Sequence, residues 1–429
     1  MPLIALAIAA GAPAQQPKSL YDQVVMRPDP SNGFDDYIRA ADAINDGYAR
    51  VYMTWRPGDY DRLLKLAGNS TDAATTERLR LAKELDEGGY LGVQAAMAKR
   101  YGRALDLLRQ GNQKRVWDPR SLGYRTPLPE VPVLYALVAL CCSAAYTDYA
   151  KGDPKAGTRD LLDGLSFASN LEPNSMIDLE KGMAWEPILM NRFAGSLGNI
   201  SEADSRQVVA FVDDQMQRPL AYASALKRQR DLVVSSINDI VTPGLKHREY
   251  ETPSEAFTWT MTAEQRNQAA AAIVDGVNRR YSDIMQMLDG PESTWNSMRM
   301  EVPDPDDPVS DVDTFVRRYV EGFGVPGSMS LIQRERTSMR LLGLNARIIN
   351  FRWHNNRLPN TLAEAVPKDR IRDPISDQDF VYEPNPDGTY RLYSKGNAAT
   401  GIIELRYRPS GSGGNDQVPP PGISAQARG

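Results

Sequence analysis

The fold of this chain is decided by residues 330–355, SLIQRERTSMRLLGLNARIINFRWHN. Apolar residues recur in this stretch at steps of three and four, which places an apolar stripe along one side of an α-helix: Leu331, Ile332, Leu342, Ala346, Ile349 and Trp353. The helix should end near Asn355, because Leu358-Pro359 cannot continue it. Thr361 and Glu364 then match a capping box, which predicts a second, short helix.

A small antiparallel sheet is predicted after these helices. Residues 380–382 (FVY) and 390–394 (YRLYS) flank the turn PNPDG at 384–388. The Asp-Gly pair of this turn supplies the positive-φ positions that a β-hairpin needs. A third strand is predicted because apolar residues alternate with charged ones at Ile403, Leu405 and Tyr407. Together the two elements predict a unit over 329–408, a long helix with a three-stranded β-meander.

The order of residues in this unit resembles an ending found in uncharacterised exported bacterial helical proteins. The resemblance is carried by LPNTL at 358–362, Asp373-Pro374, FVY at 380–382 and GTYRLYSKG at 388–396. A similar pattern closes the globular part of the major pseudopilins of type II secretion. The resemblance implies a helix followed by a meander, and it implies no activity, since one fold element serves many functions.

Two features separate the chain from a true pseudopilin. Pseudopilins begin with a leader and a long apolar assembly helix, and the sequence has no such helix. They also carry carboxylates after the tyrosine-bearing strand, where calcium can bind, whereas this chain has Lys395 and Asn397. We therefore expect neither a calcium site nor a fibre-forming role.

The composition is that of a soluble globular protein. The 429 residues are 41% hydrophobic and 24% charged, with a net charge of −5. This length corresponds to two or three domains or to one large helical unit. The mild acidity argues against nucleic acid and anionic lipid as partners, because both require a strongly basic face.

The N-terminus predicts export. Residues 3–10 are apolar, and Ala12-Pro13-Ala14 resembles a signal-peptidase site, although no basic residue precedes the apolar run. A disordered alanine-rich tail is the alternative. The run is too short to span a bilayer, so no stable membrane anchor is expected and the mature protein should be periplasmic or extracellular. The predicted organisation is a signal peptide (1–14), an extended linker (15–31), an α-helical domain (32–328), the helix-and-sheet unit (329–408) and a disordered tail (409–429).

The middle of the chain predicts stacked antiparallel helical pairs. The clearest pair covers residues 133–171, where Asp153-Pro154 supplies an N-cap followed by proline at the first helical position. No second copy follows at the 34-residue spacing of a tetratricopeptide array, so the packing is repeat-like without a true repeat. Cys141 and Cys142 are adjacent in the first helix, where bridging would be strained, and buried thiols are expected.

Two loop patterns suggest ligand sites that the sequence does not favour. Residues 322–327, GFGVPG, match the glycine pattern of dinucleotide-binding proteins, but the preceding segment reads as helix and the acidic partner is replaced by Arg347. A linker between helices is the preferred interpretation. Six acidic residues between Glu301 and Asp313 could hold calcium, yet they lack EF-hand spacing, which favours a solvated loop.

Histidine and tryptophan identify no reaction centre. The two histidines, His247 and His354, have no neighbour at metal-ligand spacing, so a zinc site is not expected. His354 should cap or pack at a helix end, and His247 should lie on the surface. Five tryptophans near predicted helix ends could line a sugar-binding cleft, although closing a helical core is the more frequent role: Trp55, Trp117, Trp185, Trp259 and Trp295.

Two functions remain open from the sequence. The first is an exported, non-enzymatic scaffold or binding module of the cell envelope, with envelope proteins or peptides as partners. The alternative is a helical glycan-active hydrolase that uses paired carboxylates. Because the chain has 55 acidic residues, no catalytic pair can be selected, and neither a cofactor nor a metal is expected. A groove lined by aliphatic residues would favour peptides, whereas a deep cleft with Trp, Tyr and two acids would favour sugars.

Overall fold

The long helix α14 (Val325–Asn355) runs through the molecule as predicted and ends at the expected residue. We describe a computed structural model, which covers residues 19–25, 27–68, 72–120, 128–218, 220–241, 262–297 and 325–405. The predicted apolar stripe is wrong at its two ends, because Leu331 is 45% exposed and Trp353 is 58% exposed. In the middle the helix is buried on more than one side, since neighbouring elements cover it: Leu341, Leu342, Leu344, Ala346, Ile348 and Ile349.

The N-terminal part is a series of helices in which Asn32 caps α2 by accepting a hydrogen bond from the Phe34 N–H. The bounds are α1 (Leu20–Val24), α2 (Gly33–Ile44), α3 (Ala49–Thr54), α4 (Asp59–Ala67), α5 (Ala73–Arg100) and α6 (Gly102–Asn112). Helix α1 lies in the segment 15–31, so the prediction of an extended linker is wrong there. Helix α5 bends at Gly89, which has a φ of 60° that glycine adopts readily.

The central helices stack in antiparallel pairs, and the predicted pair around Asp153 is confirmed as α7 and α8. Asp153 caps α8 through the Ala156 N–H, and Ser201 and Asp204 form a capping box at α10. Cys141 and Cys142 are buried free thiols, as predicted. The bounds are α7 (Val131–Ala150), α8 (Pro154–Leu171), η1 (Glu172–Asn174), α9 (Met176–Ser196), η2 (Leu197–Asn199) and α10 (Glu202–Gln217).

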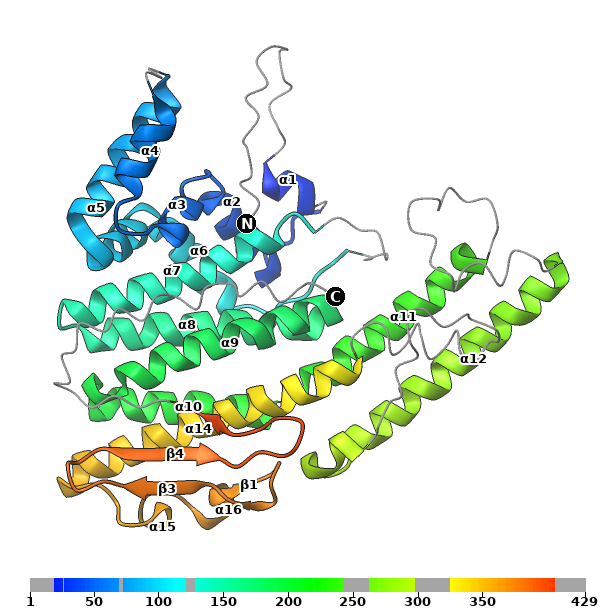
Figure 1. Cartoon of the computed structure of the whole chain (residues 1–429). Helices are drawn as coiled ribbons and strands as arrows, with labels where there is room; N and C mark the ends of the chain where they lie inside the picture. The colour runs from blue at the N-terminus through cyan, green and yellow to red at the C-terminus, as the bar shows by residue number, and fades with distance from the viewer. Residues whose placement is uncertain are drawn as a thin grey trace.

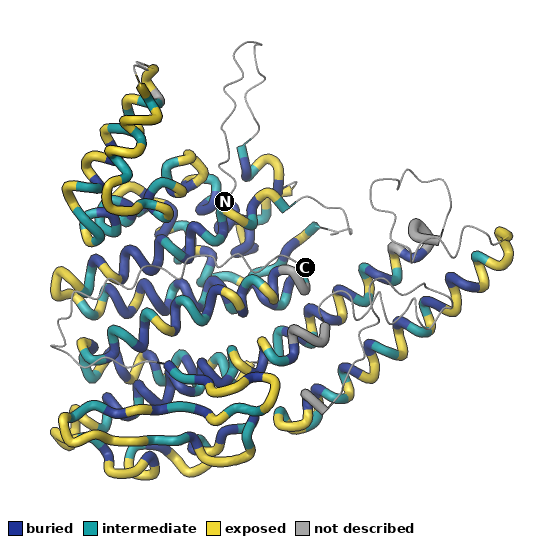
Figure 2. Tube along the Cα trace, in the orientation of Figure 1, coloured by how far each residue is buried: buried dark blue, intermediate teal, exposed yellow. Residues whose placement is uncertain are grey.

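Helices α11 (Ala221–Val241) and α12 (Ala263–Leu288) form an arm that extends away from the stack (Figure 1). Thr262 and Gln265 form a capping box at the start of α12. The short turn η4 (Glu292–Ser297) follows α12 and contacts the first half of α14. Figure 2 shows alternating buried and exposed residues along α12, as expected for a helix that is covered on one face.

The C-terminal sheet confirms the predicted meander. Strands β3 (Val381–Pro384), β4 (Tyr390–Ser394) and β5 (Ile403–Glu404) pair antiparallel in the order β3-β4-β5, and Gly388 takes a φ of 81° in the turn. The Tyr390 hydroxyl donates to Asn345 Oδ1 at 2.8 Å and ties the sheet to α14. The sequence did not predict a second, two-stranded sheet, which is formed by β1 (Arg372–Asp373) and β2 (Gln378–Asp379).

The short helices before the sheet differ from the prediction in one detail. Helix α15 (Leu362–Ala365) is followed by α16 (Lys368–Ile371). The capping box expected at α15 is wrong, because the Thr361 side chain makes no cap hydrogen bond and Glu364 pairs with Arg357 instead. A charged partner therefore competes successfully with the helix terminus for the carboxylate.

The helices bury two hydrophobic clusters. The larger, here called the main core, runs through α2, α5 to α10, the middle of α14 and the sheet. The smaller, here called the arm core, joins α11 and α12 to the start of α9 and the start of α14. Both α9 and α14 therefore cross from one cluster to the other. Their crossing segments form the boundary between the clusters.

Candidate functional site

A cavity of about 380 Å³ lies at the boundary between the main core and the arm core. This volume is in the range of small-molecule sites in proteins. Much of its lining is apolar and comes from both sides of the boundary: Val116, Leu179, Met183, Met216, Leu220, Tyr222, Ile332 and Met339. The packing of two separately filled cores thus leaves a space between them.

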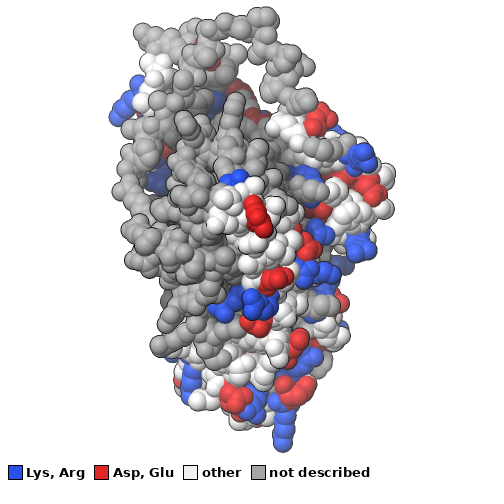
Figure 3. Space-filling model, turned by 90° about the vertical axis from the view of Figure 1, so that its right-hand side faces the viewer, with Lys and Arg blue, Asp and Glu red and all other residues white. Residues whose placement is uncertain are grey.

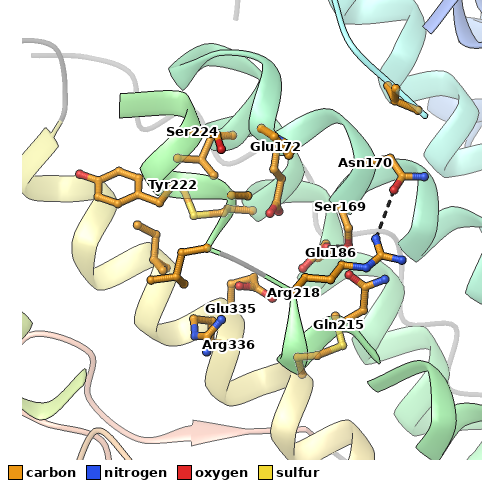
Figure 4. A pocket seen from close by; sticks show the side chains of 18 of the residues that line it. Ser169, Asn170, Glu172, Glu186, Gln215, Arg218, Tyr222, Ser224, Glu335 and Arg336 are labelled. Carbon is orange, nitrogen blue, oxygen red and sulfur yellow. Dashed lines mark hydrogen bonds between the residues drawn. The ribbon is translucent and has the colours of Figure 1, made fainter. Parts of the chain in front are cut away.

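Three glutamates line this apolar cavity. Glu172 comes from η1, Glu186 from α9 and Glu335 from α14, and Figure 4 shows their side chains converging. Glu172 is 8% exposed and Glu186 is 1% exposed. The Glu335 side chain retains some accessible surface, although its carboxyl lies deep among protein atoms. We refer to Glu172, Glu186 and Glu335 as the carboxyl trio.

The hydrogen bonds of the trio are incomplete. Ser169 Oγ donates to Glu186 Oε1 at 2.5 Å. Glu186 also lies within hydrogen-bond reach of Glu335. No N–H or O–H group among the described residues donates to Glu186 Oε2 or to Glu172 Oε1. A buried carboxylate oxygen without a donor is costly, so these atoms require a proton or a ligand.

Burial raises the pKa of all three glutamates, and repulsion within the trio adds to this effect for Glu172 and Glu186. The pKa of Glu186 is raised well above 4.5 by burial, by the charges of Glu172 and Glu335, and by its hydrogen bond to Glu335. The pKa of Glu172 is also raised well above 4.5, by burial and by Glu335. The pKa of Glu335 is raised less, because an interaction with Glu186 lowers it. Burial and the neighbouring acids therefore both favour the protonated form of Glu186.

Nearby arginines compensate the trio only in part, because another acid engages them. Arg336 lines the cavity, and its charge lowers the pKa of Glu172 and Glu335 without overcoming the effect of burial. Glu292 Oε1 lies 3.0 Å from Arg336 Nε and 2.6 Å from Arg340 Nη2. Although burial opposes ionisation of Glu292, hydrogen bonds from Arg340 and Arg336 hold its pKa below 4.5. Both arginines thus form their ion pairs with Glu292, and among the described residues neither forms one with the trio.

The residues considered from the sequence lie elsewhere. Among the described residues, no tryptophan lines this cavity. Trp185 stacks on Phe167 with ring centroids 6.0 Å apart, and Trp295 is buried in the arm core. His354 Nε2 lies 3.5 Å from Glu202 Oε1 at the exposed end of α14, so it pairs with an acid rather than packing. His247, Trp259 and the acidic segment 301–313 lie outside the described residues.

The glycine pattern at 322–327 is only partly described. Val325, Pro326 and Gly327 form the first turn of α14, so the expected linker is wrong at these three residues. Within the described ranges, no group of three or more His, Cys, Asp or Glu side chains is arranged to hold a metal ion.

The sequence contains a signal for part of the trio that our interpretation missed. Glu186 occupies the same helical phase as Met183, Leu189 and Met190, all of which are buried. Glu335 likewise lies three residues after Ile332 and four before Met339, which are also buried. An acid in the apolar phase of a helix indicates a buried carboxyl. Glu172, in a 3₁₀ turn, carries no such periodic signal.

Comparison with protein-family models, with curated proteins and with solved structures finds no match for this chain. One described helix, α7, is long and apolar enough to cross a bilayer, and more than half of the relevant segment is buried inside the protein. Basic and acidic side chains are intermixed over the described part of the face in Figure 3. The sequence-based expectations about partners and membrane anchoring stay predictions.

Proposed function

We propose that this protein is a non-enzymatic binding module, exported to the cell envelope, whose cavity takes up a ligand with a cationic amine and an aliphatic body. One observation carries the proposal: Glu172 Oε1 and Glu186 Oε2 lack a donor at the wall of a cavity that also offers aliphatic surface. An ammonium group supplies up to three N–H donors and one positive charge. It could therefore donate to both carboxyl oxygens and offset the charge of the acids. The leader-like residues 1–14 support the export part of the proposal.

The aliphatic lining supports a peptide-like ligand over a sugar. Sugar sites rely on flat aromatic surfaces, and Tyr222 is the aromatic residue among the described lining side chains. These features favour the binding module over the hydrolase alternative.

Uptake of a cation should expel the proton of Glu186. The ammonium makes the ionised form of the pair favourable, so the proton leaves to solvent. Affinity should therefore rise with pH from 5 to 8, up to the point where the ligand amine itself loses its charge. Binding enthalpy should also depend on the buffer, because a buffer with a large ionisation enthalpy absorbs the released proton.

The test uses L-leucyl-L-leucinamide as the amine-bearing probe and its N-acetylated form as the control without a cation. Isothermal titration calorimetry on the full chain should detect the first and not the second. Glu186→Gln cannot become an anion and should weaken binding about tenfold or more, since a charged hydrogen bond contributes about 1.5–3 kcal/mol. Glu180→Gln, on the exposed side of the same helix, is the matched control and should bind normally. Equal binding of both probes would refute the proposal.

A further inference from the structure

The entrance of the cavity carries a charge opposite to that of its interior. Lys114, Arg115 and Arg218 all line the cavity, and Arg115 and Arg218 are exposed. None of these three cations makes a described ion pair with the carboxyl trio. The lining thus combines buried acids, with Arg336 beside them, and basic side chains that reach solvent.

The cations at the entrance are available to a ligand. Arg115 stacks over the Trp117 ring at 5.9 Å and has no ion-pair partner among the described residues. Arg218 pairs with Asp214 at 2.8 Å, but both side chains are largely exposed, and such pairs contribute little to stability. Figure 4 shows the Arg218 side chain among the lining residues, hydrogen-bonded to Asn170. A ligand carboxylate could replace Asp214 at small cost.

We infer that the ligand is a zwitterion, a dipeptide-sized molecule whose amino terminus reaches the carboxyl trio and whose carboxylate is bound by Arg115 and Arg218. This inference rests on the proposed function and adds the second recognised group. The cavity volume of about 380 Å³ is at the small end for ligand sites, which limits the ligand to about this size. Guanidinium groups suit the role because they bind carboxylates through two parallel hydrogen bonds.

The experiment compares L-leucyl-L-leucine with L-leucyl-L-leucinamide, which differ only in the terminal carboxylate. Titration calorimetry at one pH and salt concentration should show about tenfold tighter binding of the free acid. The double variant Arg115→Gln/Arg218→Gln should bind the two probes equally. Arg206→Gln, which removes an exposed arginine of α10 outside the cavity, should keep the preference for the acid.

The possible outcomes separate this inference from the proposed function. If the amide binds and the free acid binds no more tightly, the zwitterion inference is wrong and the amine site stands. If the preference persists in the double variant, another group recognises the carboxylate and the assignment to Arg115 and Arg218 is wrong. If neither probe binds, the proposed function and this inference both fail. Melting curves of each variant verify that it is folded.

Discussion

Two buried clusters of acids in this protein differ in how their charge is compensated. Around Arg120, the guanidinium lies 2.7 Å from Asp118 Oδ2 and 2.7 Å from Glu130 Oε1, and both acids are almost completely buried. In the cavity, Glu172 and Glu186 are equally buried, but Arg336 and Arg340 are directed to Glu292. The first cluster contains direct ion pairs, whereas in the second Arg336 lines the cavity but forms its ion pair with Glu292. Buried acids alone therefore do not mark a site, whereas buried acids without a direct ion pair do.

The largest effect should come from removing the cation of the compensated cluster. Arg120→Leu would leave Asp118 and Glu130 buried without their partner. Breaking a buried ion pair on one side costs about 3–5 kcal/mol. Urea denaturation followed by circular dichroism should show a loss of this size in the free energy of unfolding. A loss below about 1 kcal/mol would mean that water reaches these carboxylates and that the two clusters do not differ as described.

A change of opposite sign is expected in the cavity, where Glu186→Gln should stabilise the protein at high pH. The pKa of Glu186 is raised in the folded state, while the unfolded chain ionises near its ordinary value of 4.5. Above pH 4.5 the folded state thus binds more protons than the unfolded state, so the carboxyl lowers stability progressively as the pH rises. Glutamine removes this loss.

Differential scanning fluorimetry at several pH values checks this prediction. The variant should melt on the order of 2 °C above the parent at pH 8 and at the same temperature at pH 4. Glu180→Gln on the same helix should raise the melting temperature at pH 8 by less, because burial also raises the pKa of Glu180 but Lys181 opposes this effect. A Glu186→Gln protein that is less stable at pH 8 would show that Glu186 is ionised and compensated, as the acids around Arg120 are.

The smallest effects should come from two glycines of α9. A Cβ added at Gly182 would lie 2.9 Å from Glu172 Oε1 and 2.5 Å from its Cγ, so Gly182→Ala should displace the Glu172 side chain. At Gly195 an added Cβ meets nothing within 4 Å. Gly195→Ala should therefore stabilise the protein by about 0.5–1 kcal/mol through helix propensity alone, whereas Gly182→Ala should gain less or lose stability.

Ligand binding sharpens the comparison of the two glycines. Gly182→Ala should weaken binding of L-leucyl-L-leucinamide severalfold because Glu172 no longer holds its position. Gly195→Ala should bind it as the parent does. If both variants bind equally well, Glu172 does not contact the amine and the cation interacts with Glu186 and Glu335 alone.

Local patterns predicted most of the secondary structure correctly. Asn32, Ser201 and Thr262 each cap a helix, and such caps can be recognised in a sequence because a side-chain oxygen next to free N–H groups acts within a few residues. The Asp-Gly turn and the alternating residues of β4 predicted the meander for the same reason. The prediction that Leu331 and Trp353 belong to the core is wrong, because the helical period shows which face is apolar but not how far the neighbouring elements extend.

The sequence by itself determined the helices, their caps and the hairpin, because these depend on interactions between residues close along the chain. Only the tertiary structure decided that Glu172, Glu186 and Glu335 share one cavity, since they lie on three elements separated by up to 163 positions, from 172 to 335. It also decided that Glu292 engages Arg336 and Arg340. The electrostatic state of a buried acid depends on which charges packing brings near it, and no local pattern encodes that choice.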